Sequence, residues 1–305
     1  MASQLLRVMG ASVELMDVRP AVTIVIPCWN ETPVFLRQAV DSAVSDLSEV
    51  IVVDDGSTSV ETIACLQGLP VKVIRTENGG PARARNLGAA AGTARYILPL
   101  DSDDYLGEGM VQALVSALDA DPDLAIAYTG WRRFGDDEGD VSPPERVSLT
   151  QLADFCVINN SAMFRRSAWE ALGGYDESLR QGFEDWEWWL RLLLAGGRAG
   201  LTPGVIYHYR VRSQSRNQSN HGSVDALVAT RSAMLRNNPE AAALIAEGMI
   251  SSIKQAYQQG QAQSPLAERA IAELRQWARR FGRVDGALNR LPALGWLWGR
   301  TIERR

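Results

Sequence analysis

The chain has 305 residues, 46% of them hydrophobic, and a formal net charge of −5 at pH 7. A chain of this length and composition can bury a large core, which favours one large domain with an appendage over several small domains. The acidic balance argues against a dedicated nucleic-acid-binding protein, because such proteins carry an overall positive field.

The cysteine count and the hydropathy pattern indicate the cellular compartment. The three cysteines, Cys28, Cys65 and Cys156, are odd in number and widely spaced, which indicates neither a disulfide framework nor a zinc site. Residues 1–20 lack the apolar run of a signal peptide, and no stretch is long enough to span a membrane. We therefore expect a cytoplasmic protein in which residues 1–20 form a leader.

Predicted strands and helices alternate through the first hundred residues. Short apolar or β-branched runs predict strands at 22–27, 49–53, 71–74 and 94–100. Apolar residues at helical spacing predict helices at 32–43, 60–66 and 81–91. This alternation favours the α/β class, with a mostly parallel, doubly wound sheet flanked by helices.

The predicted elements are less regular beyond residue 104. Apolar patterns predict helices and strands in turn: a helix at 109–120, strands at 124–128, 159–164 and 205–211, and helices at 168–174 and within 181–196. The segment 135–145, rich in Asp, Gly and Pro, predicts an exposed and mobile loop, and the polar stretch up to Ser223 predicts a lid. Residues 224–305 are expected to form a helical appendage, with helices at 226–236, 239–258 and 267–280.

Three carboxylates follow the predicted strand 94–100 within four positions: Asp101, Asp103 and Asp104. Ionised carboxylates this close repel one another, so the cluster favours a hard cation such as Mg²⁺ or Mn²⁺. The alternative is a solvated turn that caps the next helix, and an isolated triplet favours that interpretation. Asp55 also follows a predicted strand, and carboxyl ends of parallel strands share one crevice.

Two further segments carry polar side chains at predicted helix starts. Residues 78–88 begin with glycines and carry Arg83 and Arg85, which can bind a phosphate together with backbone amides; a glycine turn with solvent-facing arginines is equally compatible. Glu184 and Asp185 begin a helix whose tryptophan stripe is typical of core packing. Helix capping accounts for Glu184, which leaves Asp185 as the candidate for chemistry.

The stretch 275–305 is basic and contains tryptophans. Such a segment can lie in a membrane interface beside anionic lipid, or it can pack back on the domain as a helix. Both interpretations remain open, and the first implies a peripheral location on the inner face of the membrane.

Five motifs in sequence resemble those of the family 2 glycosyltransferases: VTIVIPCWNE at 22–31, VVDDGS at 52–57, ARNLG at 84–88, LDSDD at 100–104 and EDW at 184–186. The resemblance covers residues 20–215 and implies a GT-A fold, with a nucleotide-binding half at 21–104 and an acceptor half at 105–223 of one domain, 21–223. It also implies a nucleotide-diphosphate sugar donor, with a UDP-sugar favoured, Mn²⁺ or Mg²⁺, and inversion at the anomeric carbon. The acceptor is then expected to be a bacterial glycan or a lipid-linked glycan.

The resemblance assigns roles on the donor side by position. Three residues are expected to line the nucleoside pocket: Pro27, Trp29 and Glu31. Trp29 replaces the usual tyrosine and keeps an aromatic stacking face. Asp55 is expected to hydrogen-bond the base, and Arg83 or Arg85 to lie near the diphosphate or the base.

The resemblance also assigns the reacting centre. Asp103 is expected to ligate the metal, Asp101 to contact the ribose or the metal, and Asp185 to act as the general base. Arg212 stands where many relatives carry a histidine; since an arginine cannot ligate a metal, we expect it to contact the leaving diphosphate. Two alternatives remain, a sugar-nucleotide-binding protein without turnover and a metal-dependent nucleotidyltransferase.

Overall fold

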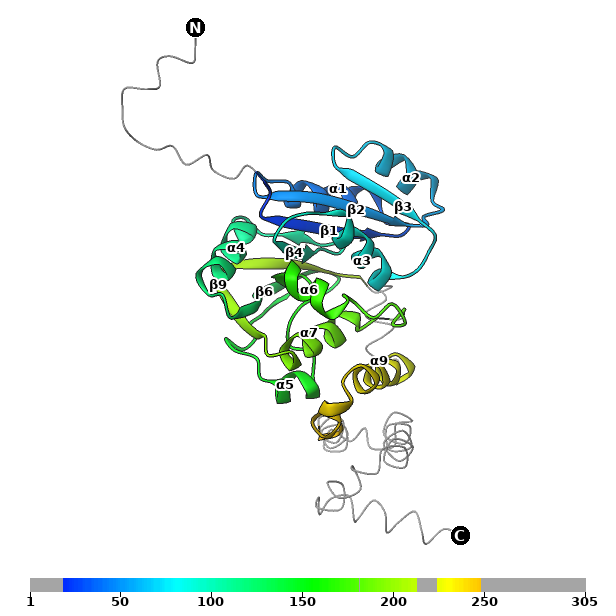
Figure 1. The fold of residues 1–305 in the computed structure, drawn as a ribbon. Helices are drawn as coiled ribbons and strands as arrows, with labels where there is room; N and C mark the ends of the chain where they lie inside the picture. Colours follow the sequence, from blue (N-terminus) through cyan, green and yellow to red (C-terminus); the bar gives the residue numbers. More distant parts are fainter. Residues whose placement is uncertain (1–18, 181, 213–223, 248–305) are drawn as a thin grey trace, which may run out of the picture.

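The computed structural model describes residues 19–180, 182–212 and 224–247, and among these residues nine strands form one sheet (Figure 1). The strand order is β3-β2-β1-β4-β8-β6-β9-β5, with β7 paired to β6. Within the described residues, no helix is long and apolar enough to cross a membrane.

The first half of the chain forms the parallel part of this sheet. Its elements are β1 (Val22–Cys28), α1 (Pro33–Ala43), β2 (Ser48–Asp55), α2 (Val60–Gln67), β3 (Lys72–Thr76), α3 (Pro81–Ala91) and β4 (Tyr96–Pro99). β1 pairs in parallel with both β2 and β4, and β2 pairs in parallel with β3. The predicted β-α alternation is therefore confirmed.

The sheet becomes mixed beyond β4. The remaining elements of this part are β5 (Tyr105–Leu106), α4 (Met110–Ala120), β6 (Leu124–Gly135), β7 (Gly139–Val141), α5 (Leu149–Asp154), β8 (Met163–Arg165), α6 (Arg166–Leu172), α7 (Glu184–Leu194) and β9 (Arg198–Val211). β8 is antiparallel to β4 and β6, whereas β9 is parallel to β6 and antiparallel to β5.

The prediction of a loop at 135–145 is wrong in part, because β7 lies inside it and pairs with β6. Gly135 and Gly139 supply the positive φ angles of 103° and 146° at the two ends of the connection. Arg132 on β6 also forms an ion pair of 2.7 Å with Asp140 on β7. The polar composition therefore reflects a hairpin whose side chains face solvent.

Alternate side chains along the strands enter two separate cores. Ile24 and Ile26 of β1 join a cluster covered by α1, α2 and α4, whereas Val25 joins a cluster covered by α3 and α7. α3 approaches β1 closely at Gly88, where an added Cβ would lie 2.2 Å from Cγ1 of Val25. Helices on both faces thus fix the strands whose ends form the site.

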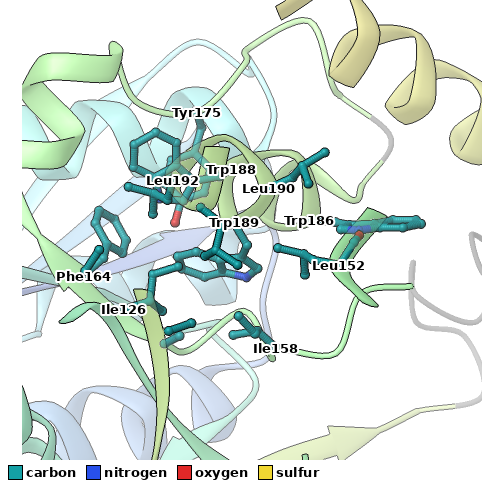
Figure 2. Close-up of a cluster of buried hydrophobic side chains, with 14 of the residues drawn as sticks. Ile126, Leu152, Ile158, Phe164, Tyr175, Trp186, Trp188, Trp189, Leu190 and Leu192 are labelled. Atoms are coloured by element: carbon teal, nitrogen blue, oxygen red, sulfur yellow. The ribbon is translucent and has the colours of Figure 1, made fainter. Parts of the chain in front are cut away.

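α7 is buried on most sides (Figure 2). The predicted tryptophan stripe is core, because Trp186 and Trp189 are 3% and 0% exposed, and Trp188 beside them is also 0% exposed. The i,i+4 ion pair of Glu187 and Arg191 forms at 2.7 Å, but Glu187 is also 0% exposed. Asn237 donates a hydrogen bond of 3.0 Å to Glu187, so the face of this pair is covered by the next helix rather than by water.

The described part of the helical appendage packs against α7. α9 (Val224–Asn237) is followed by a 3₁₀ turn at Pro239–Ala241, and its Met234 and Leu235 are buried in the α7 core. Arg231 donates a hydrogen bond of 2.8 Å to the carbonyl oxygen of Asp154. The predicted lid up to Ser223, the helix 267–280 and the basic stretch 275–305 lie outside the described residues and remain predictions.

Candidate functional site

A cavity of about 810 Å³ lies at the carboxyl ends of β1, β2 and β4. This is the sheet edge at which the sequence places Asp55 and the carboxylates that follow β4. Every predicted site residue except Arg83 lines the cavity. The structure therefore brings together the end of β1, the turn after β4 and the start of α7, which are far apart in the sequence.

One wall of the cavity begins with Trp29, a residue that is 55% exposed. The next residue, Asn30, has a positive φ of 52° and accepts hydrogen bonds from the amides of Thr58 and Ser59 at 2.7 and 2.8 Å. These contacts tie the loops after β1 and β2 together. A fixed backbone thus presents the indole ring to the cavity, where it can stack on a base.

Asp55 organises the glycine turn before α3. Its two carboxylate oxygens accept hydrogen bonds from the amides of Gly79 and Gly80 at 2.7 and 2.9 Å. Gly80 has a φ of 90°, which a side chain would disfavour. Asp55 therefore shapes the loop in addition to lining the cavity, a contact that the sequence pattern did not indicate.

The two arginines of α3 occupy different places. Arg83 packs against Gly79, where an added Cβ would lie 2.4 Å from its Cδ, and it does not line the cavity. Arg85 is 4% exposed and donates to Asp101 at 2.7 Å and to Glu184. Burial alone would lower the pKa of Arg85, but these two carboxylates raise it, so the guanidinium keeps its charge.

Asp101 and Asp103 lie side by side in the turn after β4. Asp101 Oδ1 also accepts a hydrogen bond of 3.0 Å from Asn160, and Asp103 Oδ2 accepts one of 2.5 Å from Arg212. Burial, followed by the charge of Asp101, raises the pKa of Asp103 to about 6. The repulsion expected from the sequence is thus present at Asp103.

Asp104 belongs to the scaffold. It is 1% exposed and accepts hydrogen bonds from the Tyr207 hydroxyl and, at 2.6 Å, from the amide of Arg210. Burial, together with the charges of Asp103 and Asp101, raises its pKa well above the ordinary range. The turn after β4 is therefore fastened to β9.

The donor set fits a divalent cation that is shared with a substrate. Asp101 and Asp103 each use one carboxylate oxygen in the contacts above, and the other oxygen accepts no hydrogen bond from the described residues. Among those residues, no group of three or more His, Cys, Asp or Glu forms a complete protein site. Two carboxylates completed by water and phosphate oxygens are a normal arrangement for Mg²⁺.

Arg212 joins two carboxylates of the cavity, those of Glu31 and Asp103. Its Nη1 and Nη2 donate to Glu31 Oε1 and Oε2, both at 3.1 Å, and Nη2 also donates to Asp103. The side chain is 37% exposed. A guanidinium is thus held at the edge of the carboxylate pair, where an incoming phosphate can reach it.

Glu184 and Asp185 begin α7 behind Phe183, which has a φ of 61°. The expectation that Glu184 caps the helix is wrong: α7 has no side-chain cap hydrogen bond, and the Glu184 carboxylate pairs with Arg85. Burial, followed by the charge of Glu184, raises the pKa of Asp185 to about 7, while Arg85 acts in the opposite direction. A carboxylate that titrates near neutral pH suits general base catalysis.

The lining residues that the sequence reasoning missed include Asn160 and Arg180. Asn160 contacts Asp101, and Arg180 lies against Gly80 at the start of α3. Asn160 lies inside the predicted strand 159–164 and Arg180 lies outside every predicted element, and neither belongs to one of the five motifs. Only the fold brings them to the site.

Comparisons with known proteins show which family the chain is similar to. The family model for "Glycosyl transferase family 2" matches residues 23–173. The chain is 32% identical over 250 residues to the "Succinoglycan biosynthesis protein ExoO" of Rhizobium meliloti, covering 72% of this chain and 69% of that protein. It is also 32% identical over 189 residues to the chondroitin synthase of Pasteurella multocida, covering 58% of this chain and only 19% of that protein.

A solved structure supports the same fold. The structure of S. aureus TarS 1-349 in complex with UDP-GlcNAc matches with a TM-score of 0.58 at 18% identity, covering 88% of this chain and 76% of that chain. At this identity the likeness shows the fold alone.

Proposed function

This chain belongs to glycosyl transferase family 2, and we propose that it is an inverting enzyme that transfers a sugar from a nucleotide-diphosphate donor to a hydroxyl group of a bacterial glycan or glycolipid. The observation that carries the proposal is the arrangement in one cavity of an exposed aromatic face, a carboxylate pair and a carboxylate of raised pKa: Trp29, Asp101 with Asp103, and Asp185. Two relatives named for succinoglycan and chondroitin support the glycan acceptor. The UDP-GlcNAc complex of TarS supports a UDP-sugar donor.

Asp185 acts as the general base in this proposal. Its carboxylate takes the proton of the acceptor hydroxyl while that oxygen attacks the anomeric carbon of the donor. The donor carbon–oxygen bond to the diphosphate breaks in the same step, so one displacement inverts the configuration. No covalent nucleophile is required.

Asp101 and Asp103 hold the donor end of the reaction. Through their open oxygens they would bind Mn²⁺ or Mg²⁺, which supplies positive charge to the leaving nucleotide diphosphate. Arg212 lies beside Asp103 and pairs with the same diphosphate. Measuring donor affinity for Arg212→Ala across a Mn²⁺ titration tests this role: we expect at least about a tenfold loss, as for a charge-assisted contact, and unchanged affinity would contradict it.

A screen of nucleotide sugars tests the proposed function. A ligand that binds the folded state raises its melting temperature, so the protein is heated with each nucleotide sugar in the presence of Mn²⁺. The sugar that stabilises it is then supplied with glycan acceptors, and the anomeric configuration of the product is determined. We expect inversion. Binding without turnover would favour a binding module, and pyrophosphate release from a sugar phosphate and a nucleoside triphosphate would favour a nucleotidyltransferase.

A further inference from the structure

Arg85 connects the donor side of the cavity to the residue that precedes the proposed base. Its Nη2 donates to Asp101 Oδ1 at 2.7 Å, and its Nη1 forms an ion pair with Glu184 Oε1. The side chain of Arg85 is 5% exposed and that of Glu184 is 6% exposed. One buried guanidinium therefore bridges the turn after β4 and the start of α7, and Glu184 is 99 positions from Arg85 in the sequence.

The geometry of a guanidinium explains why this bridge is rigid. The five N–H groups form a planar fork, so two carboxylates bound to different Nη atoms are held at a set distance and orientation. α7 is itself immobilised by its buried tryptophans (Figure 2). Both terminal nitrogens of Arg85 donate to carboxylates of the protein, which is the arrangement of a residue that joins two segments.

We propose that Arg85 is a positioning residue that acts through Glu184 to hold Asp185 at the cavity and ties this segment to Asp101 on the donor side. The proposal deepens the proposed function, because it rests on Asp185 as the base. It also differs from the role that the sequence motif implies for Arg85, which is direct contact with the donor.

The charges around Asp185 allow the effect of the bridge to be measured through the pKa of Asp185. The groups that act on it from its own helix and from the elements packed around it are Glu184, Arg85, Asp101, Cys156 and Tyr175. Glu184 raises the pKa of Asp185 and Arg85 lowers it. Removing one charge and removing the other must therefore move the titration of Asp185 in opposite directions.

The test uses Glu184→Gln, Arg85→Gln and the double variant in the full chain. The midpoint of the Asp185 carboxyl is followed by ¹³C NMR on protein with labelled aspartate, with the signal assigned by its loss in Asp185→Asn. We expect a lower midpoint in Glu184→Gln and a higher one in Arg85→Gln, each by at least about half a pH unit. Glu184→Gln keeps the side-chain shape, so it tests the bridge even if Arg85→Gln does not fold.

The kcat and the affinity for UDP distinguish a positioning role of Arg85 from direct contact with the donor. If Arg85 acts through Glu184, both changes break the same bridge. The kcat of the double variant is then no lower than the kcat of the less active single variant. The proposal would be overturned if the titration midpoint of Asp185 is the same in both single variants as in the wild type. It would also be overturned if the kcat losses of the two single variants multiply in the double variant and Arg85→Gln loses affinity for UDP. The NMR midpoints are independent of turnover, so a wild-type protein that transfers no sugar would count against the proposed function alone.

Discussion

The raised pKa of Asp185 predicts that sugar transfer depends on pH near neutrality. Burial and the charge of Glu184 raise this pKa to about 7. The base accepts a proton only in its ionised form, so turnover must rise as pH increases through this value. An ionised fraction of about one tenth at pH 6 and about nine tenths at pH 8 gives about a tenfold increase in kcat.

The assay is release of UDP at saturating donor, acceptor and Mn²⁺. Saturation matters because the pKa of Asp103 is also raised, to about 6, so its protonation would otherwise weaken donor binding at low pH. The kcat is measured from about pH 5.5 to pH 8.5. A flat kcat over this range, which is what a base with an ordinary carboxyl pKa of about 4 would give, would refute the assignment of Asp185 as the base.

Three further experiments test the fold and the donor pocket by substitution. Arg191→Ala leaves the fully buried Glu187 without its ion pair and should lower the free energy of unfolding, measured by urea titration, by about 3–5 kcal/mol. The control Arg132→Ala breaks an exposed ion pair and should lower it by under about 1 kcal/mol. Equal losses in the two variants would contradict the burial argument. Gly88→Ala should destabilise by about 1–3 kcal/mol, because its Cβ would overlap β1; unchanged stability would contradict this close approach. Trp29→Ala should weaken UDP binding about tenfold in calorimetry while Trp29→Phe retains it, and equal affinities would exclude stacking.

The parallel part of the fold was predictable because its signals are local. β1 is an apolar β-branched run, and Pro33 and Pro81 mark the first residues of α1 and α3. The short strands were not predictable, because their stability comes from distant partners. Tyr105 of β5 pairs with His208 of β9, and two residues carry no periodicity.

The identities of the site residues were predictable from the sequence, but the contacts between them were not. Asp101, Asp103 and Asp185 were identified from motifs, and the fold brings all three to one cavity. The ion pair between Arg85 and Glu184 could not be predicted, because each residue has a sufficient local explanation, a helix-start arginine and a capping carboxylate. Only their shared burial reveals the pairing.

Replacing Asp185 with asparagine tests the central claim most directly. The amide keeps the size of the side chain but cannot accept the proton of the acceptor hydroxyl. Transfer of sugar by Asp185→Asn should fall by about 10²–10⁴-fold, the usual contribution of a general base. UDP-sugar affinity, measured by calorimetry on the same preparation, should stay unchanged. Transfer at the wild-type rate, or loss of donor binding together with transfer, would contradict the account.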